Sequence, residues 1–161
     1  MNWLANDNNP EYHRRVTGPA IAKAIAREGR SLVDSVVVSV GSAGTITGVG
    51  ETLKAWTNDV RMVAVEPFES QALSGGFTGG HGIPGNGLRL HPQKLQCLRG
   101  GQRRRRHPLR RRPRRTESLI TDAIPASLSA GAALHAAAQL LAKGDQPFGP
   151  RHPQRTAEPD F

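Results

Sequence analysis

The stretch Ser35–Pro67, "SVVVSVGSAGTITGVGETLKAWTNDVRMVAVEP", decides the fold. Its first six residues are mostly β-branched and are bounded by Asp34 and Gly41, which predicts a short buried strand. "ITGVGETLKAW" (Ile46–Trp56) repeats its apolar residues with a helical period, and "VRMVAVEP" (Val60–Pro67) predicts a second strand. A strand, a helix and a strand in this order predict a βαβ unit with parallel strands, and therefore the α/β class.

The turn "GSAGT" (Gly41–Thr45) joins the first strand to the helix. The first backbone N–H groups of a helix lack intrahelical partners, and together with the helix dipole they form a natural anion site. Ser42 and Thr45 can add hydroxyl donors. A Gly-x-x-Gly turn alone is more often a tight connection without a ligand. It matches neither the dinucleotide fingerprint nor the P-loop, because no lysine follows Gly44.

The flanking sequence fits one soluble domain. "PAIAKAIAREG" (Pro19–Gly29) and the alanine-rich "SAGAALHAAAQLLAK" (Ser129–Lys143) each predict a helix. With 161 residues and a 37% hydrophobic fraction, we expect a modest core. Cys97 is the only cysteine, so no internal disulfide is possible. No apolar run approaches the ~20 residues that cross a bilayer, and we expect a cytoplasmic protein with no membrane partner.

The positive charge is local. The chain carries a net charge of +9, but ten of its arginines lie between Cys97 and Arg115. Without them 12 basic residues face 13 acidic ones, a net of −1. The run Arg103–Arg115 has no interleaved aromatic residues and no helical pattern. It predicts nonspecific, salt-dependent binding to nucleic acid; a sequence-selective nucleic-acid-binding protein is the alternative.

Several motifs together resemble the cysteine synthase (O-acetylserine sulfhydrylase) family, with cystathionine β-synthase as a close relative. The family pattern G-T-G-G-T-I-T-G corresponds to Gly41–Gly48, and "VAVEP…S…LSGG" corresponds to Val63–Gly76. "NPE" followed by His13, "TGP" at Thr17–Pro19 and a glycine pattern at His81–Pro92 agree as well. The resemblance implies the parallel-strand large domain of pyridoxal-phosphate (PLP) fold type II, here an incomplete three-layer αβα structure.

The resemblance also implies a cofactor site. The phosphate of pyridoxal 5'-phosphate would be held by five consecutive residues: Gly41, Ser42, Ala43, Gly44 and Thr45. Ser42 keeps the hydroxyl of the family's threonine, whereas Ala43 adds a methyl group where close approach and a free φ matter. Gly85 would lie near the cofactor ring. Ser129 of "LSAGA" would correspond to the serine that meets the pyridine nitrogen; a helix N-cap is the alternative role for Ser129. No metal site is expected.

The implied activity is β-replacement on O-acetylserine by sulfide, giving cysteine, with a small amino-acid substrate and a homodimer; a cystathionine β-synthase-like enzyme is the alternative. The family carries its cofactor on a lysine in an "S-x-K-D/N-R" motif, in the half that precedes the matching region. The four lysines here, Lys23, Lys54, Lys94 and Lys143, lack that context. We therefore expect no catalytic residue in this chain and no turnover by the chain alone.

The chain divides into four expected regions. Residues 1–95 form the phosphate-binding region, 96–128 the arginine-rich segment, 129–143 a family-like helix and 144–161 a disordered tail. The family has an acidic, strand-forming "D-E-V-I-T-V-S-D" where the arginines stand. Arginine codons read one base late encode Asp, Val, Ala or Gly, so "RRRRH" (Arg103–His107) can conceal "DDVVI". We hypothesise that 96–128 is translated out of frame.

Overall fold

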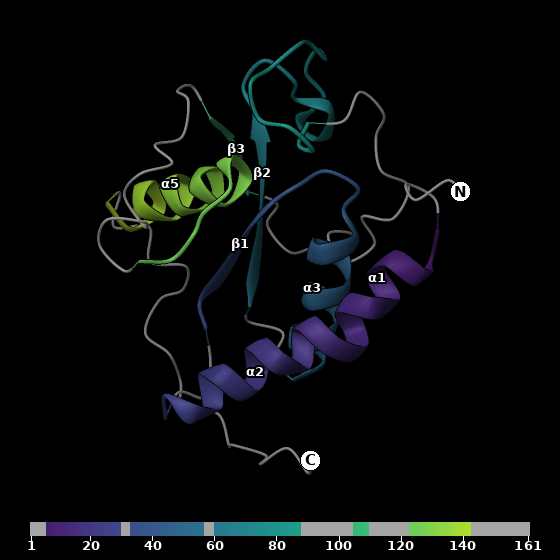
Figure 1. Cartoon of the computed structure of the whole chain (residues 1–161), viewed down its shortest axis with the longest axis vertical. Helices are drawn as coiled ribbons and strands as arrows, with labels where there is room; N and C mark the ends of the chain where they lie inside the picture. The colour runs from purple at the N-terminus through teal and green to yellow at the C-terminus, as the bar shows by residue number, and fades with distance from the viewer. Residues whose placement is uncertain (1–5, 30–32, 57–59, 88–104, 110–122, 143–161) are drawn as a thin grey trace.

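The computed structural model describes residues 6–29, 33–56, 60–87, 105–109 and 123–142, with the backbone alone for 105–109. Figure 1 shows its helices and strands. In chain order these elements are α1 (Asn8–Tyr12), the π-helix η1 (His13–Thr17), α2 (Gly18–Arg27), β1 (Ser35–Ser39), α3 (Gly44–Trp56), β2 (Arg61–Pro67), the 3₁₀-helix η2 (Ala72–Ser74), β3 (Arg105–Leu109) and α5 (Leu128–Ala142).

The three strands form one parallel sheet in the order β1-β2-β3. Ser35 of β1 lies opposite Arg61 of β2, and Val63 of β2 lies opposite Arg105 of β3. β2 is therefore the central strand of the described sheet, and all of its residues after Arg61 are buried. The parallel βαβ unit predicted from the sequence is confirmed.

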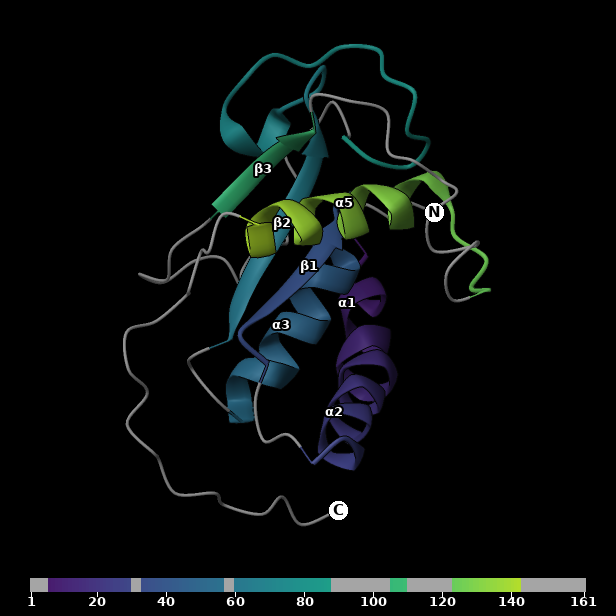
Figure 2. The same ribbon diagram turned by 90° about the vertical axis from the view of Figure 1, so that its left-hand side faces the viewer.

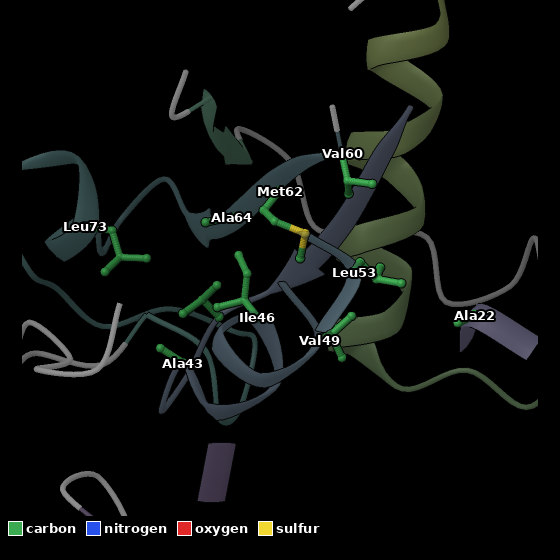
Figure 3. Close-up of a cluster of buried hydrophobic side chains, with 10 residues drawn as sticks. Ala22, Ala43, Ile46, Val49, Leu53, Val60, Met62, Ala64 and Leu73 are labelled. Carbon is green, nitrogen blue, oxygen red and sulfur yellow. The ribbon is translucent and has the colours of Figure 1, made fainter. Parts of the chain in front are cut away.

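Helices cover both faces of the sheet, which gives the expected three layers (Figures 1 and 2). Successive side chains of a strand point to opposite faces. Met62 and Ala64 accordingly pack with α3, in the cluster drawn in Figure 3. Val65, the next residue after Ala64, points to the opposite face and packs instead with Ala132 and Ala136 of α5. The incomplete αβα architecture is thus observed.

The first three helical segments, α1, η1 and α2, run on directly from one another and pack against α3. Two glycines allow this contact. A Cβ atom at Gly48 would lie 2.3 Å from the carbonyl oxygen of Pro10, and one at Gly18 would lie 2.7 Å from the side chain of Thr52. Arg14 forms ion pairs with Glu11 and, across the helix interface, with Glu51. The N-terminal helices therefore pack on α3 with close approach of the helix backbones.

The structure differs from the sequence predictions in the bounds of several elements and in the burial of one strand. The helix expected at Pro19–Gly29 is preceded by helical turns from Asn8 onward, which the sequence did not predict. The helix expected from Ile46 begins at Gly44. The prediction that Ser35–Val40 is a buried strand was wrong in its burial, because every residue of β1 is only partly buried. Within the described residues β1 has β2 as its single neighbouring strand.

Candidate functional site

The turn between β1 and α3 lies at the carboxyl edge of the parallel sheet, where ligands of open α/β sheets usually bind. β1 ends at Ser39, and α3 begins at Gly44 and runs for 13 residues. The helix is long enough for its N-terminal amide groups to attract an anion. Of the two hydroxyl residues at this turn, Thr45 is exposed and Ser42 is partly buried. The turn therefore offers amides and hydroxyls together.

Ala43 adopts a left-handed backbone conformation with φ of 66° and is 4% exposed. An L-residue with a Cβ adopts this conformation at a cost of about 1–2 kcal/mol, whereas glycine adopts it freely. The expectation that φ matters at this position is confirmed. The methyl group itself packs in the hydrophobic cluster with Ile46 and Val49, so burial offsets part of the strain.

The loop 81–87 lies directly against the turn. A Cβ atom at Gly41 would lie 2.0 Å from the carbonyl oxygen of Gly85, and the Gly87 N–H donates to the Val40 carbonyl at 3.1 Å. Gly85 and Gly87 have φ values of 82° and 57°. The structure thus brings Gly85 next to Gly41, and two left-handed glycines allow that approach.

Two buried polar residues that the sequence reasoning missed hold the segments that follow β2. Glu66, at the end of β2, is 1% exposed; its carboxylate accepts hydrogen bonds from the Leu73 N–H at 2.9 Å and from the Ser74 hydroxyl. Ser70 is fully buried and donates to the Gly87 carbonyl at 2.7 Å. The available signal was a glutamate directly after four apolar strand residues, since a buried carboxylate needs donors nearby.

Asn9 and His13 reach the turn from the N-terminal helices. The Asn9 amide Nδ2 donates to Ser42 Oγ at 2.8 Å, and His13 Nε2 lies 3.1 Å from Thr45 Oγ1. Burial lowers the pKa of His13 below its usual 6.5. The resemblance to the family included "NPE" and His13 but implied no role for them. Their spacing of four is the signal, because it places both on one helix face.

Ser129 lies near the same edge of the sheet but on the α5 side. The Ser39 hydroxyl donates to the Ser129 carbonyl at 2.7 Å. The alternative role of Ser129 as the N-cap is wrong. Ser127 Oγ accepts from the Ala130 N–H at 3.1 Å, so Ser127 caps α5 and Ser129 lies inside the helix. Ser129 Oγ is 2.9 Å from Ser127 Oγ.

The lysines that the structure describes lie away from the turn. Lys54 follows Gly44 by ten residues on α3, about 15 Å along the helix axis. Lys23 lies on α2, beyond the point where Gly18 contacts Thr52. Lys94 and Lys143 lie outside the described residues. The described part of the chain has no group of three metal-ligating side chains, and none of its helices is long and apolar enough to cross a membrane.

Comparison with known proteins identifies relatives over part of their length. A probable cysteine synthase from Bacillus subtilis is 46% identical over 80 residues, which is 50% of this chain and 25% of that protein. A cysteine synthase from Staphylococcus aureus is 34% identical over 140 residues, which is 83% of this chain and 42% of that protein. No family model matches the chain.

Solved structures of similar proteins agree with this sequence similarity. O-acetyl serine sulfhydrylase isoform 3 from Entamoeba histolytica is similar with a TM-score of 0.71 and 33% identity, covering 84% of this chain and 39% of that one. The O-acetylserine dependent cystathionine β-synthase from Helicobacter pylori has a TM-score of 0.74 at 25% identity, covering 88% of this chain and 44% of that one. This chain is therefore a homologue of the cysteine synthases, with the PLP fold type II architecture, and spans less than half of the length of these relatives.

Proposed function

We propose that Gly41–Thr45 holds the phosphate group of pyridoxal 5'-phosphate, and that this chain forms the phosphate-binding part of a cysteine synthase-type enzyme. The observation that carries the proposal is the left-handed turn at the start of α3, with hydroxyls on Ser42 and Thr45 beside the helix N-terminus. The cysteine synthases are PLP-dependent and act on amino acids. Amides, hydroxyls and the absence of a carboxylate at the turn fit a phosphate dianion.

The proposed reaction is replacement of the acetoxy group of O-acetylserine by sulfide, which gives cysteine and acetate. The bound cofactor would withdraw electrons from the α-carbon of the amino acid and so make its proton acidic. This chain would contribute the phosphate contacts of Ser42 and Thr45 and the loop around Gly85. Ser129 would donate its hydroxyl toward the pyridine nitrogen. The chain would supply no cofactor lysine and would be inactive alone.

Ligand binding tests the phosphate site. 4-Deoxypyridoxine 5'-phosphate lacks the aldehyde and forms no covalent bond with lysine. We expect the chain to bind this phosphate at least tenfold more tightly than 4-deoxypyridoxine, since hydrogen bonds to a charged group each contribute about 1.5–3 kcal/mol. Isothermal titration calorimetry measures both constants. Equal affinities would reject the phosphate site.

Activity assays test the rest of the proposal. We expect no cysteine from O-acetylserine and sulfide with the chain and pyridoxal 5'-phosphate alone. Turnover that disappears on replacing one of its lysines would reject the assignment. The likeness to the Helicobacter pylori enzyme favours a cystathionine β-synthase-type second candidate. In an assembly that restores activity, homocysteine instead of sulfide as the accepted nucleophile would support that candidate.

We also propose that 96–128 is a shifted reading frame. The structure supports this at one point: β3 begins at Arg105, and the shifted frame of Arg103–His107 can encode "DDVVI", whose apolar residues fall on 105–107. The coding DNA tests it; failure of every one-base shift to give an acidic strand would reject it.

Arg103–Arg115 would bind nucleic acid nonspecifically. Binding to unrelated duplexes should fall steeply with salt, and a preference for one sequence would contradict this.

A further inference from the structure

We infer that Asn9 and His13 are positioning residues that hold the hydroxyl hydrogens of Ser42 and Thr45 toward a phosphate bound at the turn. This inference rests on the proposed function, and it concerns residues that do not themselves need to touch the ligand. The N-terminal helices would set the direction of two hydrogen bonds before the ligand arrives.

At Ser42, both observed neighbours are donors. The Asn9 Nδ2 donates at 2.8 Å, and the Gly44 N–H donates at 3.4 Å to the same oxygen. An amide nitrogen cannot accept a hydrogen bond, so neither contact uses the hydroxyl hydrogen of Ser42. That hydrogen remains available for an acceptor at the turn.

The Asn9 contact depends on Gly44. A Cβ atom at Gly44 would lie 2.0 Å from Asn9 Oδ1, so any other residue would displace the amide. The second glycine of the turn is therefore required by the N-terminal helix, in addition to any approach by a phosphate.

At Thr45 the same result follows from the tautomer of His13. The imidazole lies between two hydroxyls, with Nδ1 at 2.9 Å from Thr17 Oγ1 and Nε2 at 3.1 Å from Thr45 Oγ1. A neutral imidazole has one donor and one acceptor nitrogen. A dianion at the turn favours the arrangement in which Thr17 donates to Nδ1 and Nε2–H donates to Thr45, because every hydrogen then points toward the negative charge.

The consequence is selectivity for a ligand group that only accepts hydrogen bonds. A phosphate dianion accepts strong, charge-assisted hydrogen bonds from both hydroxyls, whereas a neutral hydroxyl group at the same place accepts weaker ones and brings a hydrogen of its own, for which neither oriented hydroxyl is an acceptor. The pair Asn9 and His13 would thus raise the affinity for the phosphorylated form of a ligand over its unphosphorylated form.

The substitution Asn9→Asp tests Ser42. Aspartate has almost the same size, but its carboxylate accepts, so the Ser42 hydroxyl would turn away from the ligand. We expect the affinity for 4-deoxypyridoxine 5'-phosphate to fall 10- to 100-fold, with the affinity for 4-deoxypyridoxine unchanged. Arg15→Gln, at an exposed side chain of the adjoining π-helix η1, is the matched control and should change neither value.

The ¹⁵N shifts of the His13 imidazole test Thr45 without any substitution. In the complex with 4-deoxypyridoxine 5'-phosphate, we expect Nε2 to carry the proton and Nδ1 to be bare. Absence of phosphate-dependent binding by the unaltered chain would reject the proposed function and this inference with it. Tight phosphate-dependent binding together with an unchanged Asn9→Asp variant, or with a proton on Nδ1, would reject the inference and leave the proposed function standing.

Discussion

β1 and β3 both pair in parallel with β2, but their sequences differ completely. β1 is "SVVVS", and Val36, Val37 and Val38 all pack against apolar side chains. β3 is "RRHPL", with a proline that cannot donate a backbone hydrogen bond. β-Branched residues favour the first strand locally, whereas nothing in the residue types favours the second. The comparison indicates that β2 and the fold around it place β3, whereas the residue types of β1 themselves favour a strand.

The largest expected effect tests the half of the molecule whose sequence agrees with its fold. Gly48→Ala would place a Cβ atom 2.3 Å from the Pro10 carbonyl oxygen, so α1 would have to move away from α3. We expect the free energy of unfolding to fall by about 3 kcal/mol or more, measured by urea denaturation. Gly80→Ala, where a Cβ atom meets nothing within 4 Å, is the control. Equal losses in the two variants would show that the helix contact is not tight.

The second effect concerns β3 and has the opposite sign. The register sets Arg105, Arg106 and His107 opposite three buried residues of β2: Val63, Ala64 and Val65. The triple substitution Arg105→Val, Arg106→Val and His107→Ile installs the residues that the shifted frame can encode. We expect stabilisation by about 3 kcal/mol, from apolar burial and strand propensity.

Urea denaturation also measures this change. The matched control is Arg110→Val together with Arg111→Val, which removes two arginines, as the β3 variant does, at positions that follow Leu109 in the sequence. Stabilisation of similar size in the control would mean that removing positive charge, rather than filling the strand, is responsible. Destabilisation by the β3 variant would contradict the place of this strand in the sheet.

The sequence predicted those parts of the fold where local preference and tertiary position agree. The valine-rich strands and the helix from Ile46 to Trp56 were found, and so was the glycine turn. The helical turns from Asn8 to Thr17 were missed, because Asn8, Asn9 and Pro10 favour a turn when read locally. Packing of Gly48 on Pro10 outweighs that preference. The half-burial of β1 could not be predicted, since it depends on which strands pair around it.

The candidate site likewise contains some residues that the sequence predicted and others that it did not. Ser42, Thr45 and the left-handed turn followed from the motif, and Gly85 was expected near the same ligand. Asn9 was missed as a contact of the turn because it is 33 positions from Ser42, and only the fold brings the two together. Ser127 rather than Ser129 caps α5 because the helix begins one residue earlier than its apolar pattern predicts.

A buried polar side chain in the loop 81–87 gives a smaller effect. Asn86 is 6% exposed, and within the described residues its Nδ2 has no hydrogen-bond partner. Asn86→Ile would remove a buried, unpaired donor. We expect stabilisation by about 1–2 kcal/mol in thermal and urea unfolding. Asn86→Asp is the contrasting variant and should destabilise, and a neutral Asn86→Ile would mean that the amide is satisfied.

The smallest effect is a pH dependence that originates at His13. Its folded pKa lies below the unfolded value near 6.5 because burial disfavours the charged form. Above pH 6.5 both states are neutral, so the histidine costs nothing. As the pH falls below that value the unfolded state binds the proton first, so stability declines until the folded pKa is passed. The partial exposure of His13 keeps the decline small.

The carboxylates around His13 titrate in a separate window. Glu11 pairs with Arg14 and Arg15, which lower its pKa below 4.5, so its contribution is lost only under more acidic conditions. Between pH 7 and 5 the decline should therefore belong largely to His13 and should shrink in His13→Gln, measured as the urea midpoint against pH. Because η1 reaches the turn through this histidine, bound 4-deoxypyridoxine 5'-phosphate should alter the same slope. If the slope of the urea midpoint against pH is the same in His13→Gln, a group other than His13 titrates in this range. The pH dependence would then give no link between the N-terminal helices and the turn.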